Sequence, residues 1–231
     1  MDFITIIQNI GKILSRYWYV FVVKGVGYTL LLSTVVLVFG AILGSIMAVG
    51  KGSKIAPLRW LITAIVEVVR GTPSLLHLYV GYFFVPKILN INGLSAQKQA
   101  FFCCAVALIV NSAAYVSEIV RSGIEAVDKG QTEASRSLGV NGFSTMTKVI
   151  LPQAIKNILP ALGNEFITVI KETSLASTFF VGDLMTAFLE VRGITYLPVE
   201  CLIIVAVIYF IITFTLSKCL GVFERKMKKN A

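Results

Sequence analysis

The chain has 231 residues, of which 56% are apolar and 14% are charged, with a mean hydropathy of +0.83 and a net charge of +9. Soluble domains have about 45–50% apolar and about 25% charged residues, so this composition excludes an ordinary soluble domain. The basic excess stands beside apolar runs, where membrane orientation and anionic lipid explain it, and it does not indicate binding to nucleic acid. One histidine and four cysteines without C-x-x-C spacing predict neither a metal site nor a disulfide.

Apolar runs of membrane-spanning length recur along the whole chain. A helix needs about 20 mainly apolar residues to cross a bilayer. The second run contains Gly71-Thr72-Pro73, and because proline removes a backbone donor we expect a kink near Thr72. Residues 183–198 are more polar and are expected to form a loop. The sequence therefore predicts an all-α integral membrane protein that forms a single domain over residues 1–231, with five transmembrane helices at about 25–50, 58–85, 99–121, 158–181 and 200–222.

Five spans place the two chain ends on opposite sides of the membrane, and the distribution of Lys and Arg chooses the orientation. Thirteen of the 21 Lys and Arg residues fall after the first and third spans and in the C-terminal tail, against six on the other side. Cytoplasmic segments carry the basic excess. We expect the N-terminus outside, and the C-terminus and the polar loop 127–156 in the cytoplasm. The basic cluster 225–229 is expected to contact membrane lipid.

The loop 127–156 has the signals of two short helices. Thr132 and Glu133 suit a helix start, and Gly139 permits the left-handed geometry that ends a helix. Asn141 can cap a second helix, in which one face is apolar. That face consists of Phe143, Met146 and Ile150, and the prolines 152 and 160 are expected to interrupt the chain after it. From these residues alone the segment could be a docking knob or a loop lying on the lipid headgroups.

The spacing within this loop resembles the EAA loop of ATP-binding-cassette (ABC) importer permeases. The matching residues are Glu133, Ala134, Gly139, Val149, Leu151 and Pro152. Ser135 and Val149 depart mildly from the usual alanine and isoleucine. The resemblance implies that residues 133–138 form a coupling helix seated in a cleft of a separate ATPase subunit. The residues it assigns to ATPase coupling are Glu133, Ala134, Ser135, Leu138 and Gly139.

The resemblance covers most of the chain and includes the segments 70–73, 111–115, 163–166 and 171–175, which look like the polar amino acid branch of the type I importer permeases. It implies a multi-pass protein of the cell membrane that takes a polar amino acid from an extracytoplasmic binding protein. It also implies an ABC ATPase subunit dimer and a second permease chain, either another copy or a related sibling. The chain lacks a G-x-x-x-x-G-K-[ST] phosphate loop, so it is expected to be a non-enzymatic subunit without a cofactor, with ATP bound by the partner.

Polar and charged side chains within the spans are costly and indicate function. Six of them fall in one layer of the second, third and fourth spans: Glu67, Arg70, Asn111, Ser112, Lys171 and Glu172. Glu165, Thr168 and Glu172 share one helix face at i, i+3 and i+7, which predicts a polar stripe along a pathway. The residues assigned to the substrate pathway are Glu67, Arg70, Asn111, Ser112, Glu165, Thr168 and Glu172. A cavity that offers both positive and negative charges suits a zwitterionic amino acid, and its carboxylates favour an amino acid with a cationic side chain. Glu67 and Arg70 could instead form a structural pair at i, i+3. His77 is expected to face the bundle as an ordinary polar residue.

Two other functions remain to be compared with an ATP-driven importer. An ion-coupled secondary transporter or channel would act without an ATPase and would leave the loop around Glu133 without a partner. An intramembrane enzyme would need a metal set or a Ser–His pair at membrane depth, and the sequence shows neither.

Overall fold

The structure is a computed structural model that describes residues 3–91 and 93–229, with side chains through residue 227. The described residues form helices and no strand, which confirms the all-α fold. An N-terminal helix α1 (Phe3–Tyr19) continues through the π-helical turn η1 (Val20–Gly25) into α2 (Val26–Lys51). The helical chain thus starts well before residue 25, where the apolar run begins, because α1 is amphipathic and lacks a continuous apolar stretch.

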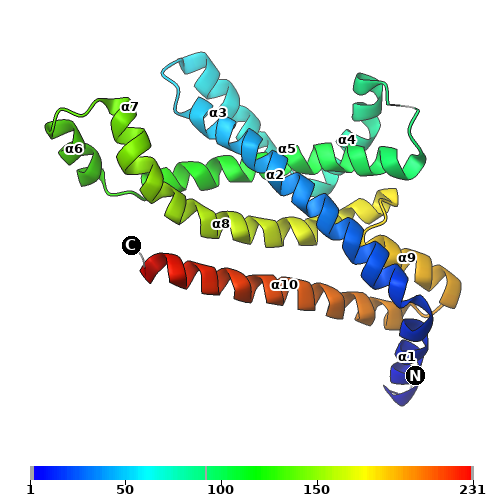
Figure 1. Ribbon diagram of the computed structural model, residues 1–231. Coiled ribbons are helices and arrows are strands. Elements are labelled where there is room, and N and C mark those ends of the chain that lie inside the picture. Colours follow the sequence, from blue (N-terminus) through cyan, green and yellow to red (C-terminus); the bar gives the residue numbers. More distant parts are fainter. Residues whose placement is uncertain (1–2, 92, 230–231) are drawn as a thin grey trace.

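A broken helix follows α2. Helix α3 (Ala56–Arg70) and helix α4 (Ser74–Leu89) meet at Gly71-Thr72-Pro73 with a bend of 108°. The expected kink at Thr72 is therefore a complete break, because Pro73 lacks a backbone N–H and Gly71 already caps α3. The long helix α5 (Ala96–Glu125) comes next and crosses the centre of the molecule (Figure 1).

Two short helices lie at the end of α5. They are α6 (Lys129–Ser137) and α7 (Gly142–Thr145), and a π-helical turn η2 (Met146–Ile150) leads from α7 into α8 (Leu151–Glu172). Pro152 lies in the first turn of α8, where no donor is required, and Pro160 lies inside it. The prediction that these prolines interrupt the chain is wrong, because the helical path runs through both.

The last third of the chain returns along α8. The 3-10 segment η3 (Thr173–Phe179) follows α8, then α9 (Leu184–Thr195) and the long α10 (Pro198–Lys229). Residues 183–198 were expected to form a loop but contain α9. Asp183 caps α9 by accepting hydrogen bonds from the backbone N–H groups of Met185 and Thr186, at 3.0 and 3.3 Å. An aspartate before an apolar run was the missed signal.

Helix lengths and bends within the described residues agree with a polytopic protein. Three stretches are long and apolar enough to cross a membrane: Phe3–Lys51, Ala96–Glu125 and Pro198–Met227. The count is five if each bent pair is one span, the pairs being α3 with α4 (108°) and Gly142–Phe179 with α9 (45°). The orientation and span limits stay predictions. In Figure 1 the two chain ends lie at opposite ends of the molecule, with α6 and α7 on the side of the C-terminus.

Helices α2 and α5 pack closely along a seam of small residues. A Cβ placed at Gly44 would lie 2.7 Å from the carbonyl oxygen of Ala113 and 2.7 Å from the Cβ of Val116. One turn away, a Cβ at Gly40 would lie 3.0 Å from the Ser112 side chain. Small residues at i and i+4 let helix backbones approach one another in membranes. The seam fixes α5, which carries two of the predicted pathway residues, against α2.

Candidate functional site

A part-buried carboxylate cluster joins α4, α5 and α8. We define this cluster as Ser74, Asn111 and Glu172. The Ser74 hydroxyl donates to Glu172 Oε1 at 3.0 Å, and the Asn111 amide Nδ2 donates to Glu172 Oε2 at 3.0 Å. Asn111 is 2% exposed. The three residues come from sites 37 to 98 positions apart in the chain, and only tertiary packing brings them together.

The carboxylate of Glu172 has no cationic partner among the described residues, whose ion pairs lie elsewhere, around Glu118. Instead it lies at the N-terminus of α4, where Ser74 is the first residue. The unpaired N–H groups of a helix N-terminus stabilise negative charge. The break between α3 and α4 therefore places a helix N-terminus, whose groups are uncharged donors, beside the carboxylate of Glu172.

His77 extends the cluster toward the break. Its Nδ1 lies 3.2 Å from Asn111 Oδ1, and its Nε2 lies 2.7 Å from the hydroxyl of Thr72. The prediction that His77 faces the bundle holds, but the sequence reasoning missed its bond to Asn111. A usable signal was present, because Ser74 and His77 lie three residues apart in the first turns after a helix break and share one face.

A second contact joins α5 to α8. The Ser112 hydroxyl donates to Glu165 Oε1 at 2.9 Å. Asn111 and Ser112 are neighbours in α5, and each reaches one of two glutamates that are seven residues apart in α8. Thr168 lies between them in sequence but is exposed and donates to the carbonyl of Asn164 in its own helix, at 3.1 Å. The structure thus brings Asn111, Ser112, Glu165 and Glu172 into contact pairs and leaves Thr168 outside them.

Glu67 and Arg70 lie on α3 and are exposed. The structure describes no ion pair between them, although it describes both residues, so their interpretation as a structural pair is wrong. The Arg70 guanidinium lies 5.7 Å from the centroid of the Tyr115 ring, a cation–π distance. Their place in a substrate pathway stays a prediction, and the structure does not connect either of them to the carboxylate cluster.

The second candidate site is a knob, which we define as residues 129–150, comprising α6, α7, the link between them and η2. Helix α6 begins after Asp128, whose carboxylate accepts a hydrogen bond from Gly130 N at 2.6 Å. The expected start at Thr132 and Glu133 is wrong, because Asp128 is the better-placed cap and Glu133 falls in mid-helix. Gly139 has a φ of +80°, and Asn141 caps α7 by accepting from Ser144 N at 2.8 Å. Both of these local predictions are confirmed.

A pair of buried hydroxyls fixes the two helices of the knob against one another. Ser135 Oγ and Thr145 Oγ1 are 2.9 Å apart, and the two residues are 7% and 2% exposed. The serine that departs from the usual alanine of the EAA pattern therefore has a partner inside the knob. Thr145 also donates to the carbonyl of Asn141, at 3.0 Å.

The knob presents apolar side chains on its surface. Leu138 is 84% exposed and Phe143 is 79% exposed, next to the exposed Glu133, Ala134 and Arg136. The expected apolar face is divided, because Ile150 is buried while Phe143 and Met146 are exposed. Large exposed apolar residues beside charged ones are typical of a protein interaction surface.

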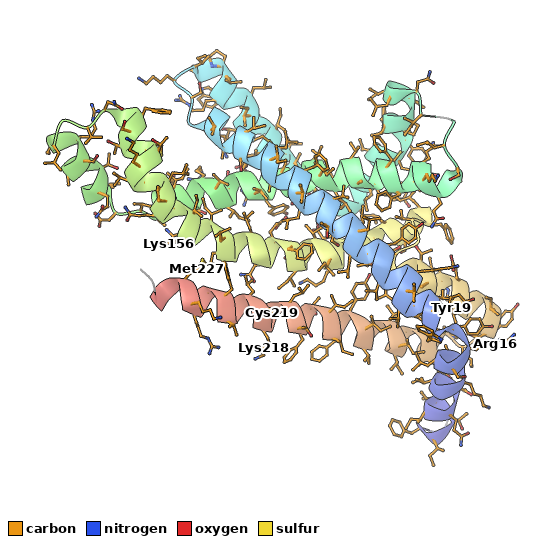
Figure 2. All side chains as sticks on the ribbon, viewed as in Figure 1. Arg16, Tyr19, Lys156, Lys218, Cys219 and Met227 are labelled. Atoms are coloured by element: carbon orange, nitrogen blue, oxygen red, sulfur yellow. The ribbon has the colours of Figure 1, made fainter. Side chains whose placement is uncertain are left out.

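A cavity of about 510 Å³ lies between the start of the knob, α8 and the end of α10. Lys156 of α8 and Met227 of α10 line it, and Figure 2 labels these two residues on their helices. Asp128 and Gln131 contribute further polar lining. Polar and apolar residues both line this recess. Among the described residues, no three His, Cys, Asp or Glu side chains are grouped to hold a metal ion.

Comparison with known proteins identifies the family. Residues 40–229 match the model of the binding-protein-dependent transport system inner membrane component. The arginine transport system permease protein ArtQ of Bacillus subtilis (strain 168) is 40% identical over 210 residues, which are 91% of this chain and 94% of the relative. The putative glutamine transport system permease protein GlnP of Rickettsia bellii (strain RML369-C) is 38% identical, over 90% of this chain and 93% of the relative.

Solved structures agree with this assignment. A crystal structure of an amino acid ABC transporter with histidines superposes with a TM-score of 0.86 at 40% identity, over 98% of this chain and 99% of that one. The MetNI methionine ABC transporter in an inward-facing conformation has the same fold, with a TM-score of 0.68 at 23% identity over 87% of this chain and 95% of that one. The chain belongs to the family of inner membrane components of binding-protein-dependent transport systems, among the ABC permeases of amino acid transport.

Proposed function

We propose that the chain is the membrane-spanning subunit of an importer for a polar amino acid with a cationic group, and that Glu172 binds that group. The observation that carries the proposal is the carboxylate of Glu172, hydrogen-bonded by Ser74 and Asn111 but without a Lys or Arg partner in the part of the chain that the structure describes. A part-buried carboxylate that is held only by neutral donors can still form a charge-assisted hydrogen bond to a cation.

An amino acid is proposed as the substrate because it always carries an ammonium group, which can bind a carboxylate such as that of Glu172, as well as a carboxylate of its own. Its ammonium group, or a basic side chain, would replace Asn111 or Ser74 as the donor to Glu172. A relative named as an arginine permease and a structure of an amino acid transporter with histidines, each 40% identical, support a basic side chain. The relative named as a glutamine permease, 38% identical, supports a neutral polar side chain. Such a substrate would still offer its ammonium group to Glu172.

The knob would couple transport to ATP hydrolysis by a partner ATPase dimer, which binds the ATP. Glu133, Ala134, Ser135, Leu138 and Gly139 lie in or beside α6, and the exposed Leu138 and Phe143 give the knob an apolar surface for a protein cleft. An extracytoplasmic binding protein would deliver the amino acid, and a second permease chain, a copy or a sibling, would complete the pathway. The competing ion-coupled transporter gives this apolar surface no partner.

The proposal is tested by uptake into proteoliposomes that contain the permease, its ATPase and its binding protein. We expect ATP-dependent uptake of polar amino acids, and loss of at least about 90% of it in Glu172→Gln, because the amide cannot pair with a cation. The control is Glu190→Gln, the same change at an exposed site on α9 outside the cluster. Uptake driven by an ion gradient without ATPase would contradict the coupling, and unchanged uptake in Glu172→Gln would contradict the site.

A further inference from the structure

Helix α1 has one face that packs on the core of the molecule. Ile13 on this face is buried, and Ile10 and Tyr17 pack against the same apolar cluster, which continues through α9 and the start of α10. Asn9 also lies on this face, and its Nδ2 donates to Glu200 Oε1, in the first turn of α10, at 3.0 Å. These contacts fix the position of α1 relative to the start of α10.

A second face of α1 is apolar but exposed. Five large side chains on it are between 37% and 75% exposed: Phe3, Ile4, Ile7, Leu14 and Trp18. At about 3.6 residues per turn they fall within an arc of about 100°. The remaining arc of the helix is polar and contains Gln8, Lys12, Ser15 and Arg16. An exposed apolar arc beside a polar one is typical of a helix that lies in a membrane interface.

Helix length places α1 outside the hydrocarbon core of the membrane. The continuous stretch Phe3–Lys51 has 49 residues and would be about 74 Å long, whereas the hydrocarbon core is about 30 Å thick. The 26 residues of α2 alone extend about 39 Å, which is enough for one span. Figure 1 shows that α1 turns aside at η1 and runs across the direction of α8 and α10, at the end of the bundle opposite the knob. A helix with this direction lies along the membrane surface.

The charged and aromatic residues of α1 suit a lipid surface. Lys12 and Arg16 lie one turn apart on the polar arc, both are exposed, and neither has an ion pair among the described residues. No acidic residue lies between Phe3 and Tyr19 to oppose them. Anionic lipid headgroups attract such cations, and Trp and Tyr are enriched at membrane–water interfaces. Charge and aromatic content therefore favour lipid over a protein partner on this face.

We propose that α1 is an interfacial anchor, which lies in the plane of one membrane leaflet and prefers anionic phospholipid. The apolar arc enters the boundary between headgroups and acyl chains to a depth of about 5–10 Å, and the polar arc faces headgroups and water. Lys12 and Arg16 attract the phosphate groups of neighbouring lipids. Because Asn9 and Ile13 join α1 to the start of α10 and to α9, the anchor fixes the depth at which α10 enters the membrane.

Tryptophan fluorescence can measure the depth of α1, because the chain has two tryptophans, Trp18 and Trp60. In the full-length chain with Trp60→Phe, held in lipid nanodiscs, lipids brominated near the headgroup should quench Trp18 most. Lipids brominated at the chain ends, and iodide in the water, should quench it less. Ile4→Trp, combined with Trp18→Phe and Trp60→Phe, should give the same pattern. If α1 instead stood upright, position 4 would lie about 21 Å further from the membrane and iodide would quench it.

Ser15→Trp in the same background is the matched control, since Ser15 is exposed on the polar arc of the same helix. Iodide should quench it more, and brominated lipid less, than the two positions on the apolar arc. Strong iodide quenching at position 4 overturns the inference, and so does strongest quenching there by chain-end bromines. Protection of Trp18 and position 4 from both quenchers also overturns it, by showing that a protein covers this face.

The lipid preference is tested with brominated phosphatidylglycerol and brominated phosphatidylcholine, each as a minor component of phosphatidylcholine nanodiscs. The phosphatidylglycerol should quench Trp18 about two- to tenfold more. Lys12→Gln with Arg16→Gln should remove this difference. Lys54→Gln with Arg59→Gln, an exposed Lys and Arg beyond the other end of α2, should keep it. Equal quenching by the two lipids with the wild-type charges, or a difference that survives Lys12→Gln with Arg16→Gln, overturns the preference for anionic lipid.

Discussion

The knob and the carboxylate cluster are both polar regions of an apolar chain, but they are built in opposite ways. Hydrogen bonds within the knob connect residues at most ten positions apart, such as Ser135 with Thr145 and Asn141 with Ser144. Those of the cluster connect residues 37 to 98 positions apart. The knob is exposed and folds from local signals, whereas the cluster is part-buried and exists only after α4, α5 and α8 have packed.

This difference predicts how each region responds to substitution. Changes in the knob should affect coupling to the ATPase while the membrane domain stays folded. Changes in the cluster should affect substrate affinity and cost stability as well, because each removed side chain leaves a part-buried polar group without one of its hydrogen-bond partners.

The largest effect should come from Gly139, whose φ is +80°. Proline fixes φ near −65° and cannot adopt this conformation, so Gly139→Pro should misplace α6 relative to α7 and abolish ATP-dependent uptake. A Cβ at this position would have no atom within 4 Å, so the effect is conformational and not steric. Substrate-stimulated ATPase activity of the reconstituted transporter is the measurement.

Gly139→Asn is the matched control for this variant. Asparagine tolerates the left-handed conformation, and coupling should remain within about threefold of the wild type. If Gly139→Pro retained normal stimulated hydrolysis, the assignment of the knob as the coupling element would be wrong.

A smaller effect should follow from Asn111→Leu in the cluster. The change removes one of two donors to Glu172 and the acceptor of His77 Nδ1, so we expect uptake to fall by about 10- to 100-fold, corresponding to roughly 1.5–3 kcal/mol. The measurement is the apparent KM, together with the yield of monodisperse protein to detect misfolding.

Ser117→Ala serves as the control on the same helix. Ser117 is buried, but its hydroxyl donates only to the carbonyl of Ala114 in its own helix, at 2.8 Å. Its uptake should stay near the wild-type level. If both variants lost uptake equally, α5 would tolerate the removal of neither polar side chain, and Asn111 would have no specific role in substrate binding.

The smallest effect should come from Ser135→Ala in the knob. The hydroxyl pair with Thr145 contributes about 1 kcal/mol, and Thr145 keeps its bond to Asn141. We expect at most about a fivefold weaker apparent affinity for the ATPase, measured by titrating the ATPase into permease-containing nanodiscs. A total loss of binding would show that the hydroxyl pair is essential to the knob and would remove the contrast drawn above.

The same contrast explains what the sequence could and could not predict. Gly139 and Asn141 were assigned correctly because turn and cap chemistry depends on adjacent residues. The start of α6 was misplaced by a few residues, since Asp128 and Thr132 are both acceptable caps and the choice depends on packing. Helix α9 was missed because its charges made residues 183–198 look polar, although Asp183 caps the helix.

Within the candidate site, Asn111 and Glu172 were selected as costly polar groups at one depth, and they do lie in contact. Their partners Ser74 and His77 could not be selected by depth alone, because the 108° break turns α4 away from α3 and places its first turn against α8. Periodicity describes a helix but does not give the angle at which a broken one resumes. For the same reason Glu67 and Arg70, just before the break, were placed in the same layer as Glu172 although nothing in the described contacts joins them to it.

The seam between α2 and α5 has a mechanical consequence. A Cβ at Gly44 would collide with backbone and β-carbon atoms of α5, so the close approach of these two helices depends on glycine, and we expect α2 and α5 to move together as one unit. Asn111 and Ser112 lie on this unit. Glu172 lies on α8 and is bonded to the first residue of α4, so we expect a movement that opens the space around Glu172 to involve α4 and α8, next to the break at Gly71-Thr72-Pro73.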